Sequence, residues 1–286
     1  MKPKLKYSEV NITNVCNYSC THCQSLNNYA FKGHQLWNDY KDEYQKLSEQ
    51  LDIDQVQIIG GEPTLNPDFE KWVDGISKLW PNSKLQISTN GSRLDKLTTD
   101  IYQILLKHKG TLWITCHDIK LYNGFLEFIE NFLDEIVSDN KEEPVKKVSR
   151  LFIDKNGVEV ILDWTQTFVS SVIDLVDNKM TMKYNSDVDE AHNTCGFKNC
   201  HQLYKGKLYK CPLISVLPDF LDQFNVKMKD EDKIIARSYQ PLAADGDVSN
   251  FVNNIDNPID QCKFCPSKYE THDFIGTDKK IKIVSI

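Results

Sequence analysis

Eight of the nine cysteines in this 286-residue chain fall into two groups, and this clustering constrains the fold more than any other sequence feature. Three lie in the segment CNYSCTHC, residues 16–23, and five lie between residues 195 and 265. An odd number of cysteines in a chain of this size argues against a disulfide framework. Thiols grouped in this way are typical of metal binding.

Composition and charge exclude several classes of protein. The formal net charge is −7, which gives no general support to nucleic-acid binding. An apolar stretch of ~18 residues, as a membrane span requires, does not occur. The segment before the first cysteine group lacks the apolar region of a secretory signal. We therefore expect a cytoplasmic protein that neither crosses a membrane nor coats nucleic acid.

Strand and helix patterns alternate through the first half of the chain. Short apolar runs predict strands at 7–13, 55–59, 84–89 and 111–116. Charged or amphipathic segments predict helices at 39–51, 67–80, 97–108 and 123–138. This order predicts an α/β fold whose parallel sheet is covered by helices.

The pattern is less regular after residue 138. Residues 139–150 are rich in charge and predict a solvated connection. Residues 151–164 fit either a hairpin turning at Asn156-Gly157 or a single strand. A helix at 166–177 and a strand at 180–185 would bring the sheet to about six strands. Short elements around cysteines follow from about residue 190, so we expect domains at 1–189 and 190–286.

The spacing C-x3-C-x2-C of the first group suits an iron–sulfur cluster. Three thiolates on one short loop can hold three corners of a cubane and leave one iron open, whereas most [4Fe–4S] sites use four cysteines. Zinc is the alternative, with His22 or a distant residue as the fourth ligand.

Two glycine-containing motifs follow the next two predicted strands. Gly60-Gly61-Glu62-Pro63 ends the second strand, and Ser88-Thr89-Asn90-Gly91 ends the third. Ligands of parallel sheets bind at the carboxyl ends of the strands. Glu62 can pair with an ammonium group, and the Ser88 and Asn90 side chains can bind hydroxyls or a carboxylate. We therefore expect a ligand site where these ends meet the first cysteine loop.

These motifs together resemble those of the radical S-adenosylmethionine (SAM) superfamily. The resemblance implies a partial (βα)6 barrel extending to about residue 186. It implies that Cys16, Cys20 and Cys23 hold a [4Fe–4S] cluster whose fourth iron is chelated by SAM, with His22 in the usual aromatic position. It also implies that SAM is contacted by Gly60, Gly61, Glu62, Ser88 and Asn90.

The second cysteine group has the spacing C-x10-G-x4-C, followed by a C-x2-C pair. Gly206 would turn a hairpin in QLYKGKLYK and bring Cys195 and Cys211 together. The pattern resembles the twitch or SPASM extensions of the same superfamily, which implies one auxiliary [4Fe–4S] cluster on Cys195, Cys211, Cys262 and Cys265. Cys200 stays unassigned, as an alternative to Cys195, and a zinc site on the same residues is the other interpretation.

Few other residues carry a functional signal. Cys116, in a predicted interior strand, is typical of a small buried apolar residue. His117, Asp163 and Tyr184 lie near predicted strand ends, which makes them candidate catalytic residues on the substrate side.

The resemblance implies an enzyme that cleaves SAM reductively and abstracts a substrate hydrogen. An auxiliary cluster with four protein ligands suits a net oxidation, such as a dehydrogenation, of a small molecule, sugar or nucleotide, and the expected electron donor is a flavodoxin or ferredoxin. A radical SAM enzyme that modifies a peptide or protein is the alternative; we favour a small-molecule substrate because the first cysteine comes too early for a peptide-recognition domain before it. A zinc-stabilised binding protein without redox activity is the alternative from a different class.

Overall fold

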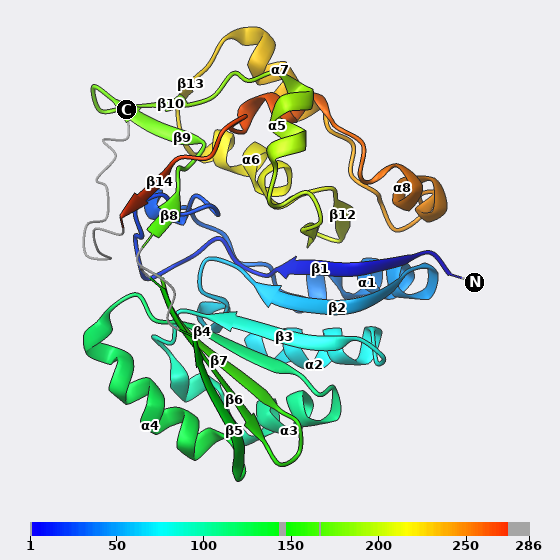
Figure 1. Ribbon diagram of the computed structural model, residues 1–286. Coiled ribbons are helices and arrows are strands. Elements are labelled where there is room, and N and C mark those ends of the chain that lie inside the picture. The colour runs from blue at the N-terminus through cyan, green and yellow to red at the C-terminus, as the bar shows by residue number, and fades with distance from the viewer. Residues whose placement is uncertain (1, 143–146, 166, 274–286) are drawn as a thin grey trace.

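The computed structural model describes residues 2–142, 147–165 and 167–273. Its centre is a nine-stranded sheet with the strand order β12-β11-β1-β2-β3-β4-β7-β6-β5 (Figure 1). Five neighbouring strands of this sheet run parallel: β1 (Lys4–Asn11), β2 (Asp52–Ile59), β3 (Lys84–Thr89), β4 (Thr111–Thr115) and β7 (Glu159–Thr165).

Helices connect the first strands and cover one face of the sheet. They are α1 (Trp37–Gln50), α2 (Phe69–Leu79), α3 (Thr99–Lys107) and α4 (Tyr122–Phe132). The apolar stripe of α2 explains its position, because Trp72 is fully buried and meets the rings of Trp37 and Tyr44 edge to face. The α/β fold with a parallel sheet is confirmed, and so are these four predicted helices, although α4 ends earlier than expected.

The charged segment after α4 is not the solvated connection that we predicted. It contributes to β5 (Ile136–Glu142) and β6 (Lys147–Asp154), two antiparallel strands that end the sheet. Their charged side chains are compatible with strands because they pair across an exposed ladder, as Arg150 does with Asp139. β6 then pairs antiparallel with β7, so of the two interpretations of 151–164 the hairpin is correct.

The predicted helix at 166–177 is wrong. This segment forms β8 (Thr167–Val169) and β9 (Ile173–Val176), in keeping with its many β-branched residues. The predicted strand at 180–185 exists in part as β10 (Lys179–Met182), but it belongs to a separate three-stranded sheet with β9 and β13 (Val226–Lys227).

The sixth parallel strand comes from a later part of the chain than we expected. β11 (His201–Tyr204) lies beside β1 and runs parallel to it, with Glu9 opposite Gln202. β11 forms a hairpin with β12 (Lys207–Tyr209), whose turn contains Lys205 and Gly206, both with positive φ. The hairpin that we predicted around Gly206 is therefore confirmed, and it also attaches the second cysteine group to the edge of the main sheet.

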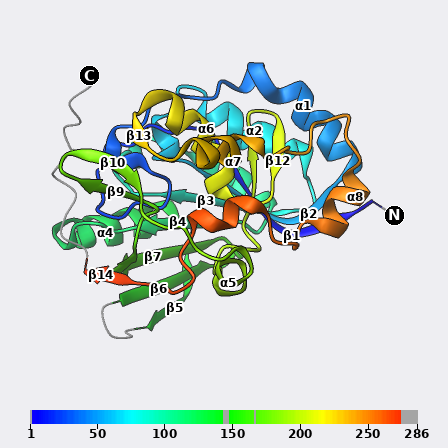
Figure 2. The same ribbon diagram turned by 90° about the horizontal axis from the view of Figure 1, so that it is seen from above.

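Six further elements lie together above β1 in Figure 1, and Figure 2 views the molecule from that side, with α6 and α7 in front of the sheet. They are α5 (Val188–Thr194), α6 (Pro212–Gln223), α7 (Asp230–Ser238), α8 (Val248–Asn254), the 3-10 helix η5 (Asp260–Phe264) and β14 (Thr271–Asp273), which pairs with β8. Within the described ranges, no helix is both long and apolar enough to span a membrane.

Candidate active site

The first cysteine loop leaves the carboxyl end of β1 and is fastened to the turn after β2. Gly61 N donates to Thr13 O at 2.8 Å, and Glu62 N donates to Val15 O at 2.8 Å. A Cβ on Gly61 would lie 2.4 Å from Val15 O, and one on Gly60 would lie 2.7 Å from Thr13 O. The two glycines are therefore needed for the close approach of these backbones. They fix where the cysteine loop begins.

The three thiols of this loop lie close enough together to influence one another. Burial raises the pKa of Cys16 to about 12, and the nearby Cys23 thiol adds to the rise. Burial also raises the pKa of Cys23, while the nearby backbone amides of residues 25–28 oppose the rise. Backbone amides directed at sulfur are a common way to stabilise iron–sulfur clusters. This donor set, which is all sulfur with amides behind it, fits a cluster.

Glu62 is fully buried and accepts hydrogen bonds from three residues. Its Oε1 accepts from Thr64 N at 3.1 Å, from Thr64 Oγ1 at 2.5 Å and from Thr89 Oγ1 at 2.7 Å, and its Oε2 accepts from Asn90 N at 2.7 Å. Burial raises the pKa of this carboxyl, and the donors oppose the rise. We expected this side chain to pair with a ligand amine; in the structure it holds the ends of β2 and β3 together.

Asn90 joins the end of β3 to the cysteine loop. Its Nδ2 lies 3.0 Å from Asn17 Oδ1, to which it donates, and 3.7 Å from Cys16 Sγ. Ser88, two residues earlier, accepts from Gln57 Nε2 at 2.6 Å. The structure therefore brings Asn90 to the thiols and places Ser88 on the face of the sheet that carries Gln57.

His22 lies within the cysteine loop and has a positive φ of 62°. Its ring stacks on His272 with centroids 4.1 Å apart, and Ser171 N donates to its Nδ1 at 3.4 Å. Gln24, two residues later, donates to Val169 O at 2.8 Å. The loop of the first cysteine group is thereby tied to β8 and β14 in the C-terminal half.

The second cysteine group surrounds a small cavity of about 30 Å³. Its lining includes all four cysteines of the expected set, namely Cys195, Cys211, Cys262 and Cys265. Cys195 follows α5 and Cys211 precedes α6. Cys262 lies in η5, and Cys265 directly follows it. Cys200 is not among the described residues that line this cavity. Burial is the main reason that the pKa of its thiol is raised to about 12, and the nearby Glu9 and Cys195 add to the rise.

Lys210 supplies positive charge beside these four thiols. It is only 4% exposed, and its Nζ donates to Ile255 O. Burial lowers the pKa of Lys210, whereas Cys262 and Cys211 raise it. A cluster bound by four thiolates is anionic, and a buried cation next to it offsets part of that charge. The donor set and its counter-charge therefore fit an iron–sulfur cluster.

Among the described residues, no three His, Cys, Asp or Glu side chains meet the geometry of a site for one metal ion. What favours clusters at both cysteine groups is therefore the chemistry around them, namely sulfur donors with backbone amides near Cys23 and a buried lysine near Cys211 and Cys262.

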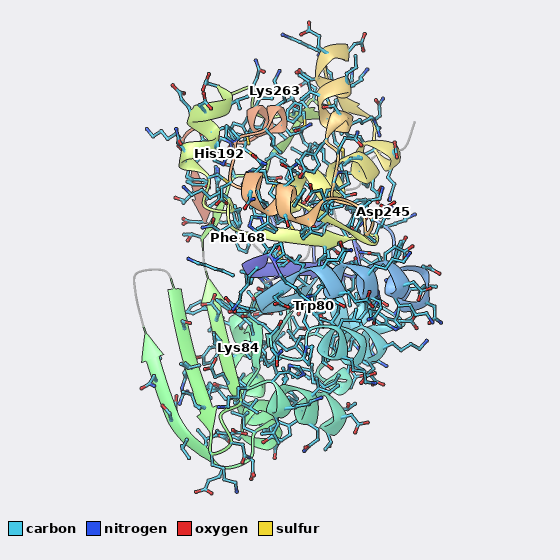
Figure 3. All side chains as sticks on the ribbon, turned by 90° about the vertical axis from the view of Figure 1, so that its right-hand side faces the viewer. Trp80, Lys84, Phe168, His192, Asp245 and Lys263 are labelled. Atoms are coloured by element: carbon cyan, nitrogen blue, oxygen red, sulfur yellow. The ribbon has the colours of Figure 1, made fainter. Side chains whose placement is uncertain are left out.

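A larger cavity of about 170 Å³ lies between the two cysteine groups. Gln24 and Ser25 of the first loop line it, as do Cys195, Cys211 and Cys265 of the second group. Glu9 and Ile59, from the adjacent strands β1 and β2, also line it. Figure 3 labels Phe168, which lies where the upper part of the molecule meets the sheet, and His192 and Lys263, which lie in that upper part. The wall of this cavity thus combines the residues that directly follow Cys23 with three cysteines of the second group.

Glu9 and its partners were missed by our sequence analysis. Glu9 Oε2 accepts from Gln202 Nε2 at 3.0 Å, and Tyr7 Oη donates to Glu9 Oε1 at 3.3 Å. Burial raises the pKa of Glu9 from its ordinary 4.5 to about 7. The signal that could have found it is the alternation of Tyr7, Glu9 and Asn11 along β1, which places polar groups on one face of a buried strand.

The three candidate catalytic residues do not form one group. His117 follows β4, where its ring meets Tyr18 edge to face and stacks on Phe168. Asp163 is 6% exposed on β7, and its carbonyl accepts from Cys116 N at 2.7 Å, so it lies at the same end of the sheet as His117. Tyr184 packs instead in the apolar cluster around Phe220 and Tyr29.

The comparisons with known proteins agree with this geometry. The sequence pattern described as "Radical SAM superfamily" matches residues 10–156, about half of the chain. The match covers the first cysteine group and both glycine-containing motifs.

Curated relatives include the GTP 3′,8-cyclase of Aquifex aeolicus (strain VF5), which is 28% identical over 174 residues, 57% of this chain and 53% of that protein. The GTP 3′,8-cyclase of Psychromonas ingrahamii is 33% identical over 94 residues, 32% of this chain and 27% of that protein. The chain thus spans about half or less of the length of these relatives.

Solved structures with detectable likeness include BtrN in complex with AdoMet and 2-DOIA, which is 25% identical in sequence with a TM-score of 0.32. The matched region covers 41% of this chain and 48% of that chain. Another is SuiB of Streptococcus suis bound to precursor peptide SuiA, which is 20% identical with a TM-score of 0.36. That match covers 45% of this chain and 30% of that chain.

Proposed function

Because the chain belongs to the radical SAM superfamily, we propose that Cys16, Cys20 and Cys23 are the three ligands of its SAM-binding [4Fe–4S] cluster. The pattern of thiols and backbone amides in this loop supports the assignment. When bound, the cluster and SAM supply a 5′-deoxyadenosyl radical that removes a hydrogen atom from the substrate.

The residues around this loop position SAM. Asn90, next to Cys16, is suited to bind the carboxylate or ribose hydroxyls of SAM. Glu62 keeps the turn after β2 next to the end of β3, so that the backbone of Gly60 and Gly61 faces the ligand at a fixed place. Ser88 and His22 complete the proposed contacts.

A second [4Fe–4S] cluster on Cys195, Cys211, Cys262 and Cys265 is the next part of the proposal. The cavity that all four thiols line supports it. Iron analysis of the anaerobically reconstituted protein tests it, with about eight irons per chain expected for two clusters. Cys262→Ser should lower the count to about four, whereas Cys200→Ser should leave about eight. Stoichiometric zinc without iron would instead support a structural metal protein.

The proposed reaction is a net oxidation, such as a dehydrogenation, of a small molecule. The single observation that carries it is the cavity of about 170 Å³ that thiols of the second group and residues of the first loop line together. A substrate held there would lie beside a group able to accept the second electron of a two-electron oxidation. The C-terminal part, proposed as a domain at 190–286, would complete the site over the barrel at 1–189.

The experiment counts electrons. The substrate should lose two electrons for each 5′-deoxyadenosine formed, with a flavodoxin or ferredoxin as the proposed external donor. A product at the oxidation level of the substrate would contradict the oxidation.

Formation of a cyclised nucleotide is a second candidate, because several curated relatives are named GTP 3′,8-cyclase. It is tested by incubating the reduced protein with SAM and GTP and analysing the products by mass spectrometry. Conversion of GTP would favour this candidate over the oxidation.

A further inference from the structure

We propose that the cavity between the two cysteine groups binds a compact, amine-bearing small molecule and that Glu9 is the residue that recognises its ammonium group. The inference rests on the proposed function, because it names the class of substrate for the same site. It starts from a buried carboxylate that the SAM and cluster sites do not use.

Glu9 is 8% exposed and lines the cavity. Its two hydrogen-bond partners are neutral donors, Gln202 Nε2 and Tyr7 Oη. Among the described residues, no Lys, Arg or His lies within ion-pair distance of it. A buried carboxylate without a counter-charge is costly, so a cation that enters the cavity gains from pairing with it.

The partners of Glu9 fix the direction of its carboxylate. Gln202 accepts from Ser215 Oγ of α6, and Tyr7 contacts Gln57 Oε1 on β2. Gln57 in turn donates to Ser88 on β3. Hydrogen bonds thus hold Glu9 from both sides, through β11 and α6 on one and through β2 and β3 on the other. Such a side chain offers a prepositioned acceptor to a ligand.

The rest of the lining favours a small ligand with an apolar side. It includes Ile59, Val169, Val172, Phe197 and Leu213, and among the described lining residues there is no Lys or Arg. A volume of about 170 Å³ is below the ~300–1,000 Å³ of pockets for drug-sized ligands. A monosaccharide-sized molecule fits this description, whereas a nucleoside triphosphate needs more room and positive charge for its phosphates.

The test uses the reconstituted full-length protein and three probes of one skeleton, titrated calorimetrically without oxygen. Glucosamine carries the ammonium group, and glucose and N-acetylglucosamine do not. We expect saturable binding of glucosamine, at least tenfold tighter than that of either neutral sugar. Glu9→Gln should remove this preference, Glu9→Asp should keep part of it, and Glu130→Gln, on the exposed side of α4, should change nothing.

Several results would overturn the proposal. The first is equal affinity for the three sugars, and the second is the lack of saturable glucosamine binding. The third is a Glu9→Gln variant that keeps the full preference for glucosamine while its iron content and thermal stability are normal. Mutually exclusive binding of glucosamine and SAM to the wild-type protein would assign the cavity to SAM and also overturn it. The proposed function is tested separately, because the wild-type protein should form 5′-deoxyadenosine from SAM without any sugar. If no 5′-deoxyadenosine forms, the proposed function is contradicted whatever the sugars bind.

Discussion

Glu62 Oε2 accepts a hydrogen bond from the backbone amide of Asn90 at 2.7 Å. This bond joins the turn after β2 to the end of β3, and the side chain of Asn90 continues the connection to Asn17 and Cys16. Two motifs that are 28 residues apart in the sequence therefore form one support beneath the first cysteine loop.

Glu62→Gln should weaken this support. An amide nitrogen at either carboxylate position would face a donor, Asn90 N on one side or Thr64 and Thr89 on the other. We expect a loss of about 2–3 kcal/mol of unfolding free energy and weaker SAM binding. Chemical unfolding and SAM titration measure the two effects, with Glu130→Gln as the control. A variant as stable as wild type would contradict the supporting role.

Cys16→Ala should abolish SAM cleavage and lower the iron content by about four per chain. The reason is that a cluster with two protein ligands in place of three is not retained. Cys116→Ala is the control, because Cys116 is buried in the core and its thiol donates to Asp118 O at 3.1 Å. It should lose about 1 kcal/mol of stability and keep both iron and activity. 5′-Deoxyadenosine and iron assays check both variants, and retained cleavage in Cys16→Ala would refute the assignment.

Gly61→Ala should displace the cysteine loop. The added Cβ would lie 2.4 Å from Val15 O and 2.6 Å from Asn27 Nδ2, so backbone must move. We expect about 2–3 kcal/mol of destabilisation together with iron loss. Gly124→Ala, in α4, is the matched control because nothing lies within 4 Å of its added Cβ. It should stabilise the protein by about 0.5–1 kcal/mol. Thermal unfolding midpoints and iron content decide, and equal behaviour of the two variants would count against the close approach.

Glu9 should make stability depend on pH. Its pKa is raised from 4.5 to about 7, mainly by burial, with Gln202 and Tyr7 opposing the rise. A carboxyl with a raised folded-state pKa stabilises the fold most below pH 4.5 and loses that contribution as pH rises through 7. The full loss is about 3 kcal/mol, of which about 1 kcal/mol falls between pH 6 and 8.

Glu9→Gln removes this titration. The difference in unfolding free energy between Glu9→Gln and wild type should therefore grow from pH 6 to pH 8 in favour of the variant. The groups that face Glu9 are Tyr7 on its own strand, Gln202 on β11 and the Cys200 thiol before β11. A difference that is constant over this pH range would contradict the assignment of the titration to Glu9.

Lys210→Met should lower the reduction potential of the proposed auxiliary cluster. The buried ammonium group beside Cys211 and Cys262 favours the more negative, reduced state, and its removal takes that contribution away. A shift on the order of tens of millivolts is expected, measured by redox titration with electron paramagnetic resonance. Lys198→Met is the comparison on the lining of the same small cavity, where a smaller shift is expected because Lys198 is exposed. An unchanged potential in Lys210→Met would remove Lys210 from this role.

The sequence by itself determined the α/β class, the four helices of the first half and the position of the motifs at strand ends. These features depend on local periodicity and on short spacings, such as the eight residues that contain Cys16, Cys20 and Cys23. The match of residues 10–156 to the radical SAM superfamily agrees with them.

Only the tertiary structure decided what completes the sheet and the site. In place of the predicted helix at 166–177 the structure has β8 and β9, and β11, far along the chain, lies beside β1. Such pairing depends on which backbone is available in space and not on local pattern. The same pairing places Gln202 opposite Glu9 and brings the second cysteine group to the cavity. Contacts of this kind join residues nearly two hundred positions apart, and no local signal in the sequence encodes them.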